Sequence, residues 1–210
     1  MKELLIVAVC LLFGAGRGYA APVTLNFDSL PTAPVLGGVI SHGNSVVENG
    51  FVFNTGAAFG GFATWPSGNS SYTGSAALFA NQSLAAISLT QQNGNPFAIA
   101  SIALTFTNLA QPGSQLVTFL GTKTDSSTVQ QSFAVSAATQ TFSFSSAFTG
   151  LTSLDWSQDS SNNHQFDNLV VDGDVAAVSA PATGALLAIV LAGLAVRRRH
   201  GARGGVRRAL

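Results

Sequence analysis

The sequence predicts an all-β fold, an antiparallel β-sandwich with jelly-roll-like topology, placed between two terminal targeting segments. Three observations predict this fold. Apolar and polar residues alternate with period two in short segments across residues 21–176. Turn-forming Gly, Asn, Ser and Pro separate these segments, and no helical period occurs before the C-terminal tail. This spacing of short strands is typical of a sandwich, with a closed β-barrel as the alternative.

The individual strands follow from the alternation. The stretch at 55–75 is rich in Gly, Ser and Asn and has too few periodic apolar residues for a regular element, so it predicts loops. Residues 123–127 predict a polar hairpin tip. In a jelly roll the two ends of the domain meet, so the first strand, near Phe27, is expected beside the last, near Leu169. Alternation predicts strands at 23–27, 51–53, 77–79, 87–89, 102–106, 117–119, 129–135, 142–144, 154–156 and 166–172.

The charges are segregated along the chain. Of nine Lys and Arg residues, only Lys123 lies between residues 21 and 180, whereas the same stretch holds eight Asp and Glu. The domain therefore carries a net charge of about −7, which excludes a nucleic-acid partner because phosphates require a basic face.

The N-terminus has the build of a secretory signal peptide. Lys2 provides the positive start, an apolar run covers 4–13, and Gly18-Tyr19-Ala20 offers small residues at the two positions that signal peptidase reads. Cleavage after Ala20 is expected, with an uncleaved anchor as the alternative. Cleavage would remove Cys10, the only cysteine, so the mature protein would have neither disulfides nor cysteine chemistry.

The C-terminal segment, residues 177–210, predicts a membrane anchor. An apolar helix is expected over 180–196, and it ends at the stop-transfer cluster Arg197, Arg198 and Arg199 in an Arg-rich tail at 197–210. Charged side chains are costly inside a bilayer and positive ends stay cytoplasmic, so the domain would lie outside the cytoplasm, held by membrane lipid. A buried helix of a soluble domain is the alternative.

This segment resembles the PEP-CTERM sorting domain of bacterial envelope proteins. The resemblance rests on Val178, Pro181, Ala182 and Thr183 at 178–183, followed by the helix and the arginines. Ser179 and Ala180 stand where the family has proline and glutamate. The resemblance implies processing by an exosortase-type transpeptidase, and release to the cell surface or an extracellular matrix that contains exopolysaccharide.

Two acidic residues are candidate calcium ligands. The segment 164–173 resembles the closing strand of carbohydrate-binding jelly rolls, and 25–31 resembles the opening strand of PEP-CTERM passengers. If these strands pair, Asp28 and Asp167 come together, and carboxylate oxygens are the ligands that calcium prefers. Hydrogen bonding to loop backbone is the alternative role for both.

Two aromatic residues are candidate glycan contacts. Trp65 and Tyr72 lie in the Gly-rich stretch and could stack on sugar rings, whereas Trp156 alternates with Leu154 as a core residue does. His42 and His164 are expected in solvated loops, with no metal role.

No nucleophile elbow, zinc motif or phosphate loop is present, so no catalytic residue is predicted. The sequence predicts a non-enzymatic, exported envelope or matrix protein without a cofactor, calcium aside. A carbohydrate-binding module, dependent on calcium or independent of it, is the alternative. A hydrolase would require paired acids, for which Asp155, Asp159 and Asp167 are the candidates.

Overall fold

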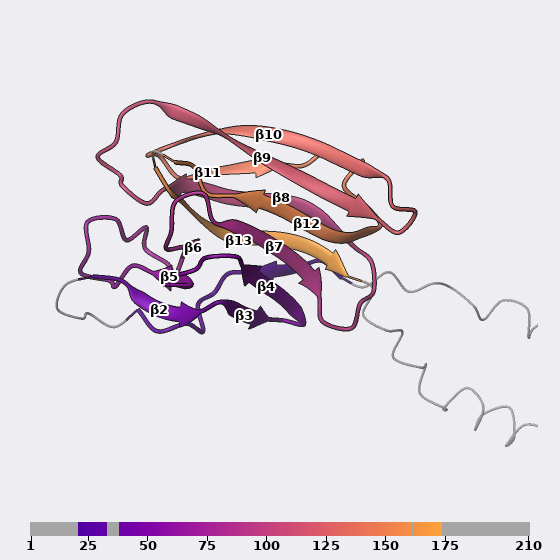
Figure 1. Ribbon diagram of the computed structural model, residues 1–210, viewed down its shortest axis with the longest axis horizontal. Helices are drawn as coiled ribbons and strands as arrows, with labels where there is room; N and C mark the ends of the chain where they lie inside the picture. The colour runs from indigo at the N-terminus through magenta and orange to yellow at the C-terminus, as the bar shows by residue number, and fades with distance from the viewer. Residues whose placement is uncertain (1–20, 33–37, 161, 174–210) are drawn as a thin grey trace, which may run out of the picture. The chain divides into compact units, whose positions relative to one another are not determined.

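Thirteen strands run through residues 21–32, 38–160 and 162–173, the ranges that this computed structural model describes (Figure 1). Their pairings are antiparallel, and no helix occurs in these ranges, so the all-β prediction is confirmed. The strands are β1 (Val23–Leu25), β2 (Ile40–Gly43), β3 (Ser45–Glu48), β4 (Phe51–Thr55), β5 (Phe62–Thr64), β6 (Leu78–Ala80), β7 (Ala86–Gln91), β8 (Phe97–Phe106), β9 (Ser114–Lys123), β10 (Thr128–Ser136), β11 (Gln140–Ser143), β12 (Leu151–Ser157) and β13 (His164–Gly173).

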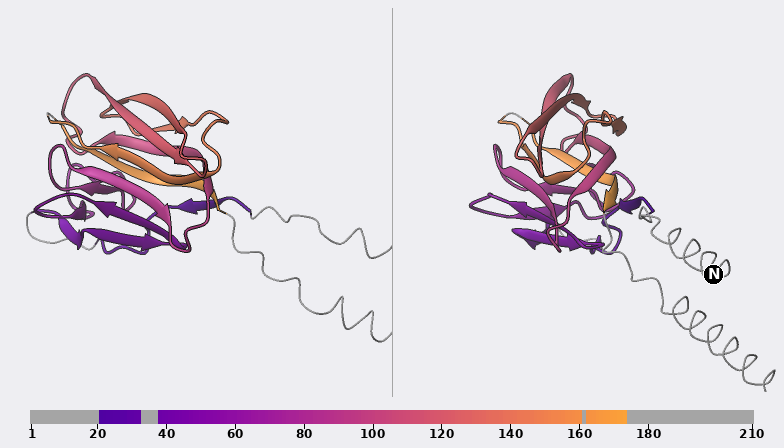
Figure 2. Two further views of the ribbon diagram at one scale, coloured as in Figure 1. Left: turned by 45° about the vertical axis from the view of Figure 1, so that its right-hand side comes forward. Right: turned by 90° about the vertical axis from the view of Figure 1, so that its right-hand side faces the viewer.

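The strands form the two layers of a β-sandwich. Sheet 1 has the order β3-β4-β7-β12-β9-β10. Sheet 2 has the order β2-β5-β6-β13-β8-β11, with β1 added to β13. A single residue pair, Leu151 with Phe97, connects the two sheets through β12 and β8. The layers can be followed in the two views of Figure 2.

The core between the sheets is built from phenylalanine. Phe166 of sheet 2 lies near its centre, with its ring centroid 5.2 Å from Trp156 and 5.7 Å from Phe53, both in sheet 1. Phe27, which follows β1, packs edge-on against Phe166 and Phe53. These side chains are buried. Each such aromatic pair contributes about 0.5–1.5 kcal/mol beyond area burial, so the pairs bind the sheets to each other.

The two ends of the domain meet, as the jelly-roll topology requires. β1 pairs with β13 in the register Val23–Val171, Thr24–Val170 and Leu25–Leu169. The predicted neighbourhood of the first and last strands is therefore confirmed.

The prediction of loops at 55–75 is wrong in one part, since β5 lies inside this stretch. All three residues of β5 are buried, as are those of β6, because side chains cover both faces of sheet 2 at this point. A strand covered on both faces shows no alternation, which is why the period-two pattern missed it. The strands β2 and β3 are short and largely polar, and the pattern missed them as well.

The predicted signal peptide, sorting motif, helix and arginine cluster lie outside the described residues. Within the ranges that are described, no helix is long and apolar enough to cross a membrane.

Candidate functional site

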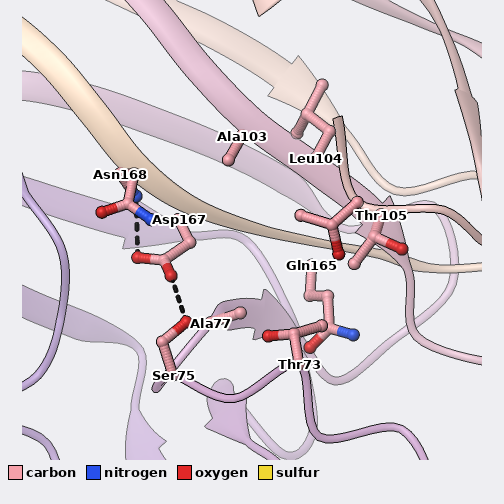
Figure 3. A pocket seen from close by; sticks show the side chains of 10 residues that line it. Thr73, Ser75, Ala77, Ala103, Leu104, Thr105, Gln165, Asp167 and Asn168 are labelled. Atoms are coloured by element: carbon pink, nitrogen blue, oxygen red, sulfur yellow. Dashed lines mark hydrogen bonds between the residues drawn. The ribbon is translucent and has the colours of Figure 1, made fainter. Parts of the chain in front are cut away.

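A polar pocket lies on the outer face of sheet 2, where β13 runs beside β8 (Figure 3). Phe166 points into the core, so its neighbours Gln165 and Asp167 point to the opposite face. The register places Gln165 beside Thr105, and Asp167 beside Ala103. Two alternate positions on each of two neighbouring strands thus form the floor of the pocket.

The chain segment that precedes β6 forms the wall of this pocket. It contributes Thr73, Ser75 and Ala77, and Thr139, just before β11, closes the opposite side. The cavity volume is about 140 Å³. Typical pockets for drug-sized ligands are about 300–1,000 Å³, so this one can hold a single small ring.

Asp167 is the ionisable group of the pocket. Its side chain is 5% exposed. One carboxylate oxygen accepts a hydrogen bond from the Ser75 hydroxyl, and the other accepts one from the Asn168 backbone N–H at 2.7 Å (Figure 3). Burial raises the pKa of the Asp167 carboxyl, an effect that the hydrogen bonds from Ser75 and Asn168 oppose and that the nearby charge of Asp28 reinforces.

A β-bulge follows this carboxylate directly. The register of β13 against β8 shifts between Asp167 and Val170, and Asn168 adopts a left-handed conformation with φ of 49°. Asparagine tolerates this conformation better than most residues. Bulges re-aim side chains and are common beside functional sites. The Asp-Asn pair at 167–168 is the only sequence signal that could have located this bulge.

The pocket combines fixed and free hydrogen-bonding groups. The Gln165 amide donates to the backbone carbonyls of Ser71 at 3.0 Å and Phe106 at 3.1 Å, which holds the loop against the sheet. In contrast, the side chains of Thr73, Thr139 and Asn168 form no hydrogen bond with the rest of the described chain. These three partly or fully exposed groups are available to a ligand.

The predicted calcium ligands lie in the same region, but only Asp167 lines the pocket. Asp28 is exposed and accepts a hydrogen bond from the Asn26 side-chain amide at 2.7 Å. The influence of Asp28 on the pKa of Asp167 shows that the two are within electrostatic range. Among the described residues there is no group of three or more His, Cys, Asp or Glu side chains suited to a metal ion. Joint binding of calcium by this pair stays a prediction.

Glu48 is a third carboxylate in this region, and sequence reasoning did not single it out. It accepts hydrogen bonds from the backbone N–H groups of Phe27, at 2.9 Å, and Asn26, at 3.1 Å. Phe27 has φ of 55°, a rare conformation for a bulky side chain. Burial raises the pKa of Glu48, which the two backbone hydrogen bonds oppose and the charges of Asp167 and Asp28 reinforce. Glu48 therefore holds the strained end of β1 in place.

The predicted glycan contacts lie near the pocket but do not line it. Trp65 is half-buried and stacks on Phe79 with 5.3 Å between the ring centroids. One face of its indole is therefore covered by the protein. Tyr72 is half-buried and directly precedes Thr73 of the pocket wall. Contact of either ring with a glycan stays a prediction.

His42 and His164 lie in strands rather than in the predicted solvated loops. His42, in β2, is half-buried, and its Nε2 lies 2.9 Å from the Thr64 hydroxyl. His164, the first residue of β13, is fully buried, and neither ring nitrogen has a hydrogen-bond partner among the described residues. Burial lowers the pKa of His164 to about 4, although the negative charge of Asp159 partly opposes this effect. Turn-forming neighbours suggested a loop at both positions, but the strand pairings bury them.

The acidic residues considered for a hydrolase do not form one site. Asp155 lines a different cavity, of about 250 Å³, on the outer face of sheet 1 with Asn54 and Ser88. Asp167 lies on the outer face of sheet 2. The sandwich core separates these two faces, so this pair cannot act on one bond.

No family model matches the chain, and no curated protein matches it. Among solved structures, the chain is similar to a structure described as carbohydrate binding module family 29, with 17% identity, a TM-score of 0.41, and coverage of 64% of this chain and 86% of that one. It is also similar to the CBM22-1-CBM22-2 tandem domain from Paenibacillus barcinonensis Xyn10C, with 14% identity, a TM-score of 0.39, and coverage of 80% and 50%. At these TM-scores, what the similar proteins bind is not carried over to this chain.

Proposed function

We propose that this domain is a non-catalytic carbohydrate-binding module that uses the pocket on the outer face of sheet 2. The observation that carries the proposal is the lining of the pocket. Three side chains that form no hydrogen bond within the described part of the chain, Thr73, Thr139 and Asn168, line the pocket together with the buried carboxylate of Asp167.

This chemistry suits a sugar because each sugar hydroxyl both donates and accepts hydrogen bonds. Threonine hydroxyls and the asparagine amide also do both, whereas an ionised carboxylate only accepts. The methyl groups of Ala77 and Ala103 offer a small apolar surface to the C–H groups of a ring. A cavity of about 140 Å³ fits one sugar unit, so weak binding to a chain end or branch is expected.

Titration of sugars into the full-length protein tests the proposal. Binding is measured at millimolar sugar by ligand-observed NMR and on a glycan array, with and without calcium. The double variant Thr73→Val, Thr139→Val should weaken binding by about tenfold, since each lost hydrogen bond contributes about 0.5–1.5 kcal/mol. The matched control is Thr90→Val, on sheet 1 away from the pocket. Binding to no sugar, in either condition, contradicts the proposal.

A location is proposed with this function. The terminal segments predict that the domain is exported and anchored in the inner membrane, or released to a polysaccharide-containing matrix after exosortase processing. Deletion of residues 181–210 should shift the protein from the membrane fraction to the medium. Unchanged fractionation of the shortened chain would contradict the anchor. Mass spectrometry of the native product would show both expected cleavage sites.

A further inference from the structure

We infer that the pocket selects sugars that carry a positively charged amine over neutral and acidic sugars. This inference rests on the sugar-binding function proposed above and names the class of sugar. It starts from Asp167, a carboxylate that is 5% exposed and lines the cavity. Its protein partners are the Ser75 hydroxyl and the Asn168 backbone N–H, and both of these are neutral.

Among the residues that the structure describes, no cation compensates this carboxylate. Lys123 is the only lysine or arginine in the described ranges, and it lies at the end of β9 in sheet 1. The charged groups that act on Asp167 and Glu48 are carboxylates, including Asp28. A buried charge without a counter-ion is unfavourable, and a ligand that supplies the opposite charge gains the corresponding interaction.

The remaining capacity of the carboxylate matches an ammonium group. Two carboxylate oxygens have about four lone-pair sites, of which the protein occupies two. An ammonium group has three hydrogen-bond donors and no acceptor, so it can donate to the two remaining lone-pair sites of the carboxylate. The free hydroxyls of Thr73 and Thr139 are then left for neighbouring sugar hydroxyls.

Acidic sugars should be excluded by the same charges. A sugar carboxylate in the pocket would lie beside Asp167 and within the field of Glu48 and Asp28, with no basic lining residue to offset the repulsion. An N-acetylated sugar has lost the charge and has a larger substituent, in a cavity of only about 140 Å³.

The experiment compares the methyl glycosides of glucosamine, glucose, N-acetylglucosamine and glucuronic acid on the full-length protein at pH about 6.5, where the sugar amine is protonated and the sugar carboxylate is ionised. The expected order of affinity is glucosamine, then glucose, then the other two. The preference for glucosamine over glucose should be on the order of tenfold, as for a charge-assisted hydrogen bond compared with a neutral one. Asp167→Asn should abolish this preference, and Asp155→Asn, which changes the net charge equally on sheet 1, should retain it.

The outcomes separate the two proposals. Equal binding of glucosamine and glucose to the wild-type protein overturns the amine preference and leaves sugar binding intact. A preference that persists in Asp167→Asn overturns the role of this carboxylate. Calcium that competes with glucosamine and strengthens glucose binding identifies Asp167 as a metal ligand and also overturns the inference. Absence of binding to all four sugars overturns the amine preference, and it overturns sugar binding as well only if no sugar on the glycan array binds. The comparison of glucosamine with glucose on the wild-type protein tests the amine preference even if Asp167→Asn fails to fold.

Discussion

Acid should destabilise this domain through His164. The imidazole is fully buried, and both ring nitrogens lack a hydrogen-bond partner among the described residues. The folded protein therefore holds the ring in its neutral form. Burial lowers the pKa of His164 from 6.5 to about 4. Below pH 6.5 the unfolded chain binds a proton that the folded protein does not bind, so the free energy of unfolding decreases as the pH falls towards 4.

The pKa difference sets the size of this effect. At about 1.4 kcal/mol per pH unit, the difference between 6.5 and about 4 corresponds to about 3 kcal/mol. This is a large part of the total stability of a small domain, typically about 5–15 kcal/mol. The carboxyls of Asp167, which is buried, and Glu48, which is half-buried, act with the opposite sign. Burial raises the pKa of Asp167 and Glu48, so the folded protein binds their protons first and gains stability as the pH falls.

Urea unfolding at pH values between about 7 and about 4.5 measures the effect. Both tryptophans, Trp65 and Trp156, lie in the domain and report its unfolding by fluorescence. The variant His164→Phe removes the titrating imidazole. The carboxyls contribute equally to the pH dependence of both proteins, so the difference in the free energy of unfolding between wild type and variant reports His164 alone. Between these limits, which do not reach the pKa of the folded state, the wild type should lose about 2–2.5 kcal/mol more than the variant. The control His42→Gln, at a half-buried ring, should change the slope less. Parallel pH curves for the wild type and His164→Phe would refute the reasoning.

Two further predictions concern the backbone. Gly61 has φ of +56°, and a Cβ there would lie 2.4 Å from the Gly43 carbonyl oxygen. Gly61→Ala should therefore cost about 1–2 kcal/mol for the left-handed conformation and about 1–3 kcal/mol for the clash. Gly150 has φ of +65° and open space around the Cβ position, so Gly150→Ala should show only the cost of the left-handed conformation in thermal melts. Equal losses of stability in the two variants would contradict the clash at Gly61. Glu48→Ala leaves the N–H of Phe27 without its acceptor and should cost about 1–3 kcal/mol in urea unfolding; an unchanged midpoint would show that Glu48 does not hold this turn.

The sequence alone determined the strand-rich character of the domain and most of its strands. Period-two alternation of apolar and polar residues is a local property of the sequence, so β8, β9, β10 and β13 could be recognised from it. In β9 and β10 this alternation corresponds to one buried and one exposed face. The sequence alone also shows that the domain is acidic, since Lys123 is the only basic residue between 21 and 180 other than the histidines. β5 has only three residues, all of them buried, and carries no such signal.

Only the tertiary structure decided which residues form the pocket. Ser75 and Asp167 are 92 residues apart, and they meet because β6 lies beside β13 in the sheet order. Sequence reasoning chose Asp167, but it could not show that its carboxylate is buried, that a bulge follows it or that Asp28 does not line the same cavity. It placed His164 in a solvated loop because the neighbours of His164 are turn formers. Burial depends on what packs against a residue from distant parts of the chain, and no local pattern contains that information.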